Sequence, residues 1–180
     1  MKKTSILIVF LIFLIGVNSY ASVKAGLWGG YNMIFENYEG QTNISKGHIA
    51  FGIKATYDMN LFKAGLLVSY MPLVDSEITG ATNTSNFSQT DIPMIVFGQI
   101  NFDAFYVLVG AGLHLAFSKT TINQEATKET EVNLGLALGT GYEIDLGKWS
   151  IDAGVLFHML MFEKESTEIL TFHAGVNYSL

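Results

Sequence analysis

The chain has 180 residues, of which 49% are hydrophobic and 14% charged, and its formal net charge is −6. This length suits one domain. The acidic balance argues against nucleic-acid binding, which requires a basic face. Because the chain has no cysteine, the sequence excludes a disulfide scaffold, a thiolate zinc site and a lipid-modified N-terminal cysteine.

Residues 1–21 have the pattern of a secretory signal peptide. A basic start, MKK, precedes the apolar run ILIVFLIFLIGV at 6–17, and small residues stand at Ser19 and Ala21. The run is shorter than the roughly 20 apolar residues that a membrane-spanning helix needs, which disfavours a membrane anchor. We therefore expect cleavage after Ala21, export, and one mature domain over 22–180.

The mature chain alternates apolar and polar residues with a period of two, which predicts β-strands, whereas helical spacing is rare. In the stretch HIAFGIKATYD, for example, Ile49, Phe51 and Ile53 share one face. Eight segments follow this pattern, at about 23–34, 48–58, 61–72, 91–102, 105–118, 132–145, 149–162 and 169–180. Each is long enough for a tilted transmembrane strand, which needs about 9–11 residues.

The expected connections differ in length. Tight turns are predicted at 58–61, 101–104 and 145–148, and polar loops at 35–47, 73–90, 119–131 and, shorter, 163–168. Short periplasmic turns opposite longer extracellular loops are typical of outer-membrane barrels. An even number of strands puts both mature termini on the periplasmic side.

Aromatic residues gather at the ends of the predicted strands. Those on the apolar face beside a tight turn or the C-terminus are Tyr57, Phe62, Phe102, Phe105, Tyr142, Trp149 and Tyr178. Such a row predicts an aromatic girdle at the periplasmic membrane interface.

The alternative is a soluble exported protein, either a lipocalin-like barrel or a β-sandwich. That fold would turn its apolar face inward and its polar face to water. Here the other face is rich in glycine, alanine and single polar residues, which suits the narrow interior of an eight-stranded barrel. We therefore predict an all-β fold: an eight-stranded antiparallel up-and-down transmembrane β-barrel.

Several stretches resemble a known family. The segment TDIPMIVFGQINFDAFYVLVGAGLHLAF is similar to the central strand–turn–strand unit of the outer membrane β-barrel domain family, the porin-family small barrels. VKAGLWGGYN resembles the first strand of that family, and LGLALGTGYEIDLGKWSIDAGVLF its sixth and seventh. The resemblance implies an outer-membrane location and a barrel of the OmpA and OmpX type, and it carries over no catalytic residue.

The C-terminal stretch TFHAGVNYSL also looks like the signal that the barrel-assembly machinery reads in this family. Phe172, Tyr178 and Leu180 are the residues that the resemblance implies for this signal. The final Leu180 departs from the family, in which an aromatic residue, usually Phe, is commoner at the end.

Charged residues are expected inside the periplasmic half of the barrel. They are Lys24, Lys54, Asp58, Lys63, Glu143 and Asp152. Reflecting the chain about its turns and loops predicts the cross-strand pairs Thr56–Lys63, Lys24–Asp58 and Trp28–Lys54. We favour a salt-bridge plug over a gated ion path, because unpaired buried charge is costly and eight strands leave an interior that side chains can fill.

All four histidines, His48, His114, His158 and His173, fall on the inward face. Reflection about the last loop places His158 opposite His173, and two imidazoles can ligate Zn²⁺ or Cu²⁺. With no inward carboxylate expected nearby, two hydrated histidines are the favoured interpretation. We therefore expect no metal site and no cofactor.

Enzymatic activity is not expected. A nucleophilic serine needs a base within hydrogen-bond reach, and every histidine points inward. The dipeptide Asp75-Ser76, near the outer rim, is the one arrangement to consider for modification of lipid A, and a polar loop is its simpler interpretation.

The sequence thus favours a non-enzymatic barrel with a structural or surface-interaction role. The alternatives are a narrow channel or transporter for small or hydrophobic solutes and, less favoured, a lipid A-modifying enzyme. The polar loops on a rigid scaffold suit contacts at the cell surface, and few aromatic residues are present to anchor a protein partner. Expected partners are outer-membrane lipid and lipopolysaccharide, the barrel-assembly machinery during insertion, and an extracellular ligand held by the loops.

Overall fold

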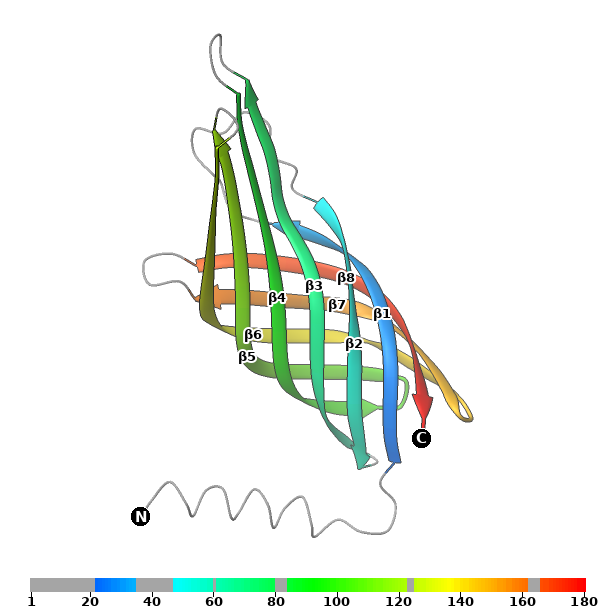
Figure 1. Cartoon of the computed structure of the whole chain (residues 1–180). Helices are drawn as coiled ribbons and strands as arrows, with labels where there is room; N and C mark the ends of the chain where they lie inside the picture. Colours follow the sequence, from blue (N-terminus) through cyan, green and yellow to red (C-terminus); the bar gives the residue numbers. More distant parts are fainter. Residues whose placement is uncertain (1–21, 35–46, 60, 80–83, 123–124, 162–165) are drawn as a thin grey trace, which may run out of the picture.

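The computed structural model describes residues 22–34, 47–59, 61–79, 84–122, 125–161 and 166–180, and the predicted signal peptide lies outside them. The described residues form eight strands that close into an antiparallel barrel in chain order (Figure 1). The strands are β1 (Ser22–Ile34), β2 (Gly47–Met59), β3 (Phe62–Thr79), β4 (Thr84–Phe102), β5 (Phe105–Ile122), β6 (Glu125–Leu146), β7 (Trp149–Met161) and β8 (Ser166–Ser179). This confirms the predicted closed eight-stranded antiparallel β-barrel.

The first and last strands close the barrel. The register between β1 and β8 runs from Lys24 opposite Ser179 to Ile34 opposite Ile169. Beyond it, the backbone N–H of Leu180 donates to the carbonyl oxygen of Val23 at 2.9 Å. Within the closed barrel, every strand has two hydrogen-bonded neighbours. The backbone N–H and C=O groups of the barrel wall are therefore paired without water.

Tight turns join β4 to β5 and β6 to β7. Asp103 has a φ of 55° and Gly147 a φ of 80°. Such positive φ values fit the twist of two-residue hairpins, and Gly147 adopts them without a Cβ clash. These turns and the C-terminus lie at the same end of the barrel (Figure 1). We call this the turn end, and the opposite end the loop end.

Four strands continue past the barrel wall at the loop end. Beyond Tyr70, where the pairing of β2 with β3 stops, and before Leu134, where that of β6 with β7 begins, the described parts of β3–β6 pair only with one another. Figure 1 shows them projecting as a tall sheet. We call this sheet, residues 71–79, 84–91, 116–122 and 125–133, the extension.

The extension corrects the predicted loops at 73–90 and 119–131. β3 runs to Thr79 and β4 begins at Thr84, while β5 reaches Ile122 and β6 begins at Glu125. Met71, Leu73 and Val74 at the base of the extension are buried in the core, but farther out polar residues predominate on both faces, so the apolar alternation that marks a half-buried strand is lost. Threonine, frequent here, is nonetheless a good strand former, and the hairpin pairing simply continues.

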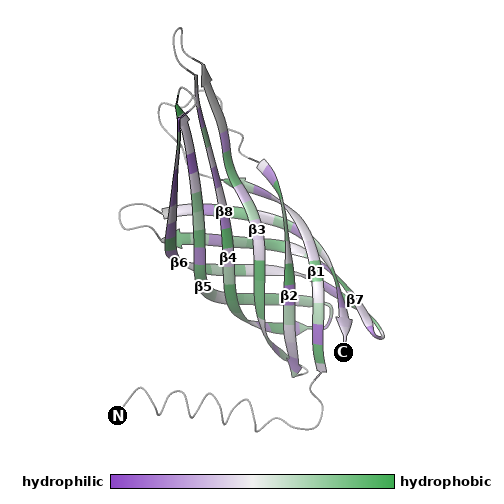
Figure 2. Cartoon of the chain, viewed as in Figure 1, coloured by the Kyte–Doolittle hydropathy of each residue, from purple (hydrophilic) through white to green (hydrophobic). Residues whose placement is uncertain are grey.

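Large apolar side chains point outward from the barrel wall. Ile49 is 75% exposed and Leu27 70% exposed, whereas inward-facing Ile95 and Leu160 are fully buried. In Figure 2 the wall is patched with green, and purple gathers toward the loop end of β6. This outward apolar face is typical of a barrel that is solvated by lipid.

The aromatic residues predicted for the periplasmic girdle lie near the turn end. Phe105 contacts Tyr142 with ring centroids 5.6 Å apart, and Trp149 contacts Tyr178 at 4.7 Å. Trp149 and Tyr142 are among the exposed side chains of the wall. Their position therefore suits a membrane interface, where an amphipathic ring meets both lipid and water.

The core of the molecule is the barrel interior. It is built from the inward face of the strands and includes Trp28, Leu67, Ile95, Phe97, Tyr106, Leu108, Leu156 and Leu160. In the described part of the chain, no helix is long and apolar enough to cross a membrane.

Candidate functional site in the barrel lumen

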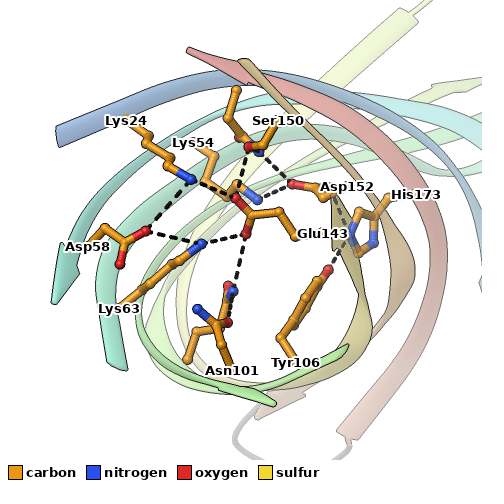
Figure 3. Close-up of polar contacts among 12 residues, drawn as sticks. Lys24, Lys54, Asp58, Lys63, Asn101, Tyr106, Glu143, Ser150, Asp152 and His173 are labelled. Atoms are coloured by element: carbon orange, nitrogen blue, oxygen red, sulfur yellow. Dashed lines mark hydrogen bonds and ion pairs between the residues drawn. The ribbon is translucent and has the colours of Figure 1, made fainter. Parts of the chain in front are cut away.

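A cluster of opposite charges fills the turn end of the lumen (Figure 3). Its members, which we call the charged cluster, are Lys24, Lys54, Asp58, Lys63, Glu143, Asp145 and Asp152. They come from β1, β2, β3, β6 and β7 because an inward-facing position of each strand reaches the same level.

Two lysines share the acidic groups at the centre of the cluster. The Nζ of Lys24 lies 3.2 Å from Oε1 of Glu143 and 2.7 Å from Oδ1 of Asp145. The Nζ of Lys63 lies 2.7 Å from Oε2 of Glu143. Asp58 is within ion-pair distance of both lysines, at 3.6 Å and 3.3 Å. The carboxylates thus link β1, β2, β3 and β6 across the lumen.

A second pair extends the cluster toward the middle of the barrel. Lys54 on β2 pairs with Asp152 on β7, whose side chain is almost completely buried. Asn177 donates to Asp152 at 3.1 Å and to the hydroxyl of Ser150 at 3.2 Å. Ser150 in turn donates to Glu143 at 2.8 Å, so neutral side chains join the two parts of the cluster. These neutral hydrogen-bond donors offset part of the cost of burying the carboxylates.

The predicted pairs in this region are wrong by two residues. Asp58, not Thr56, lies opposite Lys63. Thr56 lies opposite Lys24, and Gly52 opposite Trp28. A two-residue shift keeps each side chain on its face, because successive side chains alternate across the sheet. The predicted charged residues therefore still point into one lumen.

Apolar side chains pack above the charged cluster. Trp28, Phe97, Leu108 and Leu156 surround a cavity of about 30 Å³, room for about one water molecule. Tyr106 bounds this cavity, and its hydroxyl lies 3.1 Å from Nε2 of His173. Charged side chains thus occupy the turn end of the lumen, and a mainly apolar layer lies next to them.

A second polar group lies closer to the loop end. The Nδ1 of His114 is 2.6 Å from Oδ2 of Asp91, and both side chains are fully buried. The ring of His158 meets that of His114 edge to face, with centroids 5.8 Å apart. Nearby, Thr171 donates to the amide oxygen of Asn32 at 2.8 Å.

The predicted pairing of His158 with His173 is wrong. His158 lies opposite Ile169, and His173 opposite Gly154. The predicted pair assumes that β7 and β8 fold back on each other about the middle of the predicted loop. In the structure they fold back about a point earlier in the chain, so each residue of β7 faces an earlier residue of β8 than predicted. His173 instead lies 3.6 Å from Oδ1 of Asp152, so the expectation that no inward carboxylate is near is also wrong. Among the described residues, no three His, Cys, Asp or Glu side chains form a group that could hold a metal ion.

Two parts of the lumen were not predicted. The sequence places Asp145 on the inward face, but its position next to a turn suggests an exposed side chain outside the charged cluster. The side chain is 64% exposed, and its carboxylate nevertheless contacts Lys24. The Asp91–His114 pair was missed because the predicted loop at 73–90 puts Asp91 at a strand end. The sequence signal for this pair is a carboxylate at an inward-facing position directly after the predicted loop.

The dipeptide considered for catalysis lies on the extension. Asp75 pairs with Ser88 and Ser76 with Phe87 on β4, so both belong to a strand and not to a loop. His114 and His158 are buried in the lumen below.

Comparison with known structures supports the fold. Neisserial surface protein A, from Neisseria, is 14% identical with a TM-score of 0.57, covering 90% of this chain and 100% of that one. Ail, the attachment invasion locus protein of Yersinia pestis, is 13% identical with a TM-score of 0.54, covering 89% and 97%. A major outer membrane protein from Thermus thermophilus is 12% identical with a TM-score of 0.50, covering 90% and 100%. No curated protein matches significantly.

The match to a protein family is more extensive. The family described as "Outer membrane protein beta-barrel domain" matches residues 7–179, which include all eight strands. This confirms the resemblance drawn from the strand motifs, and it implies a location in the bacterial outer membrane. The chain belongs to the outer membrane protein β-barrel domain family.

Proposed function

We propose that this protein is a non-enzymatic integral barrel of the outer membrane whose lumen is closed and whose role is structural or surface-directed. Membership of the barrel family supports the structural or surface role. The closed lumen is our own inference, and it distinguishes this protein from a channel.

The charged cluster is the observation that carries the closed lumen. Glu143 bonds to Lys24 and Lys63, which stand on different strands, so its carboxylate bridges the lumen. All three side chains are buried. An ion passing through would have to break these contacts and leave charges unpaired in a narrow interior, which costs several kcal/mol per ion. The apolar layer around Trp28 adds a second barrier.

Conductance in planar bilayers tests this proposal. The mature chain, residues 22–180, should insert without steady single-channel current. The double variant Glu143→Ala and Asp152→Ala removes two of the four carboxylates of the charged cluster and should produce current if the cluster is the main barrier. Steady current from the wild-type barrel would overturn the closed lumen and favour the channel.

The extension is the part suited to a surface role. Its β6 segment from Glu125 to Val132 is exposed throughout. Polar side chains on a rigid hairpin, beyond the lipid band, can meet an extracellular ligand or the sugar of lipopolysaccharide. We propose that the extension faces the outside of the cell and that the turn end faces the periplasm.

Export and insertion are also part of the proposal. We propose cleavage after Ala21 and insertion by the barrel-assembly machinery, with Phe172, Tyr178 and Leu180 forming its signal. N-terminal sequencing of the protein from outer membranes should give a sequence that begins at Ser22.

Cysteine labelling tests the proposed orientation. A cysteine placed at Thr127 should be labelled in intact cells, whereas a cysteine placed at Asp103 should be labelled only in permeabilised cells. The reverse labelling pattern would contradict the proposed orientation.

A further inference from the structure

Among the described residues, most of the buried polar side chains with an unpartnered atom lie in the loop-end half of the lumen. They are Asn32, His48, Ser69, Asp91, His114, Asn133 and His158, whereas Trp28, Asp152 and His173 lie nearer the turn end. The register places Asn32 opposite His48, and His114 opposite Asn133. Buried polar groups almost always have a hydrogen-bond partner from protein or ordered water, so such a gathering points to water or an ion bound there.

Two histidines form the centre of this group. The Nε2 of His114 has no partner, and neither ring nitrogen of His158 has one, although both side chains are fully buried. Their ring centroids are 5.8 Å apart. Two imidazoles that share an ion at the usual zinc–nitrogen distance of about 2.0–2.1 Å have centroids about 5–6 Å apart. The observed separation falls within this range, and the two ring planes stand 83° apart.

Asp91 sets the orientation of His114. As a carboxylate it can only accept, so Nδ1–H of His114 donates to Oδ2 at 2.6 Å. In the neutral ring, Nε2 then keeps its lone pair and is available to a metal. Histidine ligands of metal ions typically donate their second N–H to a carboxylate in this way.

Gly135 allows this arrangement. A Cβ at Gly135 would clash with both Nε2 and Cδ2 of His114. The ring of His114 therefore lies over the bare backbone of β6, with its Nε2 edge directed away from β4 and Asp91. On the far side of β6, His158 projects from β7, opposite Ala137. The missing side chain thus lets the two rings meet across β6.

We propose that His114 and His158 bind one divalent transition-metal ion inside the lumen, with Asp91 as a positioning residue. Imidazole suits Zn²⁺, Cu²⁺ and Ni²⁺, whereas no thiolate or cluster of carboxylates favours other ions here. Because no third charged or imidazole donor in the described chain joins them, water fills the remaining positions.

Copper binding tests the site. The untagged mature chain is refolded from urea into detergent micelles with Cu²⁺ present, because the site is closed once the barrel forms. Excess metal is then removed by chelator and gel filtration. The wild type should retain about one ion per folded barrel, and the electron paramagnetic resonance spectrum should show two imidazole nitrogens on Cu²⁺.

Variants assign the ligands. His114→Gln and His158→Gln should each lose the retained ion, whereas the matched control His173→Gln should keep it. Asp91→Asn should weaken binding by about 10–100-fold and keep the two-nitrogen spectrum. A gel shift between boiled and unboiled samples verifies folding of each variant. If a histidine variant does not fold, the wild-type spectrum still decides, because a spectrum without imidazole nitrogen overturns the site. Failure of the wild type to retain Cu²⁺, or retention by both ligand variants, also overturns it.

Discussion

Glu143 holds the charged cluster together because two lysines from different strands share its carboxylate. Oε1 lies 3.2 Å from Lys24 and Oε2 lies 2.7 Å from Lys63, and Ser150 donates to Oε1 at 2.8 Å. All of these side chains are buried. A neutral residue at this position would leave the two lysines with Asp58, which they share, and the exposed Asp145 as their acidic partners.

Replacing this carboxylate should destabilise the barrel strongly. Glu143→Gln keeps the shape but removes the charge, and breaking a buried ion pair by removing one partner costs about 3–5 kcal/mol. Urea unfolding in micelles, followed by tryptophan fluorescence, measures the loss.

Asp145→Asn is the matched control for that variant. Asp145 also contacts Lys24, at 2.7 Å, but its side chain is 64% exposed. Solvent screens such a pair, so the expected loss is about 0–1 kcal/mol. Equal losses for the two variants would show that burial of Glu143 has no special role.

At the scale of the strand, one face of β6 is apolar along the half nearer the turn end. Leu134, Leu136 and Leu138 point outward there, between inward-facing Gly135, Ala137 and Gly139. In water such a row of leucines would be a hydrophobic patch, whereas in a membrane it is the surface that lipid chains solvate.

A lysine scan of β6 should reveal this lipid contact. Leu138 is 55% exposed, and Leu146, next to the tight turn, is 59% exposed. Leu138→Lys should cost about 2–4 kcal/mol in lipid vesicles because the charge enters the hydrocarbon layer. Leu146→Lys should cost about 0–1 kcal/mol because it lies at the interface. Similar small losses at both positions would mean that this face meets water.

The sequence predicts the strands where one face is apolar and fails where both faces are polar. The alternation of 132–145 marks the lower half of β6 correctly, but the stretch from Glu125 to Glu131 continues the same strand without any apolar face. Register is equally hidden. A shift of two residues, as at Asp58 and Lys63, leaves every side chain on its own face, so composition cannot detect it.

At the scale of the whole molecule, the ends of the chain complete the barrel. β8 pairs with both β7 and β1, and the N–H of Leu180 adds a hydrogen bond to Val23 at 2.9 Å. The final residue is therefore part of the closing seam. Its structural contribution is one hydrogen bond, whereas its proposed role in assembly concerns recognition before folding.

Deleting Leu180 separates these two roles. The purified variant should refold in micelles with a loss of about 0.5–1.5 kcal/mol, the value of one net hydrogen bond. In cells, its amount in the outer membrane should fall several-fold, and Leu180→Phe should restore or raise it. Immunoblots of membrane fractions measure the amount. A normal amount of the deletion variant in cells would contradict the assembly signal.

The two tryptophans of the chain stand on opposite sides of the barrel wall. Trp28 is buried in the lumen, and Trp149 is exposed at the girdle. Bromine atoms on lipid chains quench only a fluorophore that they can touch, so brominated lipids should quench Trp149 and leave Trp28 bright. In Trp149→Phe the quenching should vanish. The fluorescence of Trp149 therefore reports on contact with the bilayer, and that of Trp28 reports on the barrel interior.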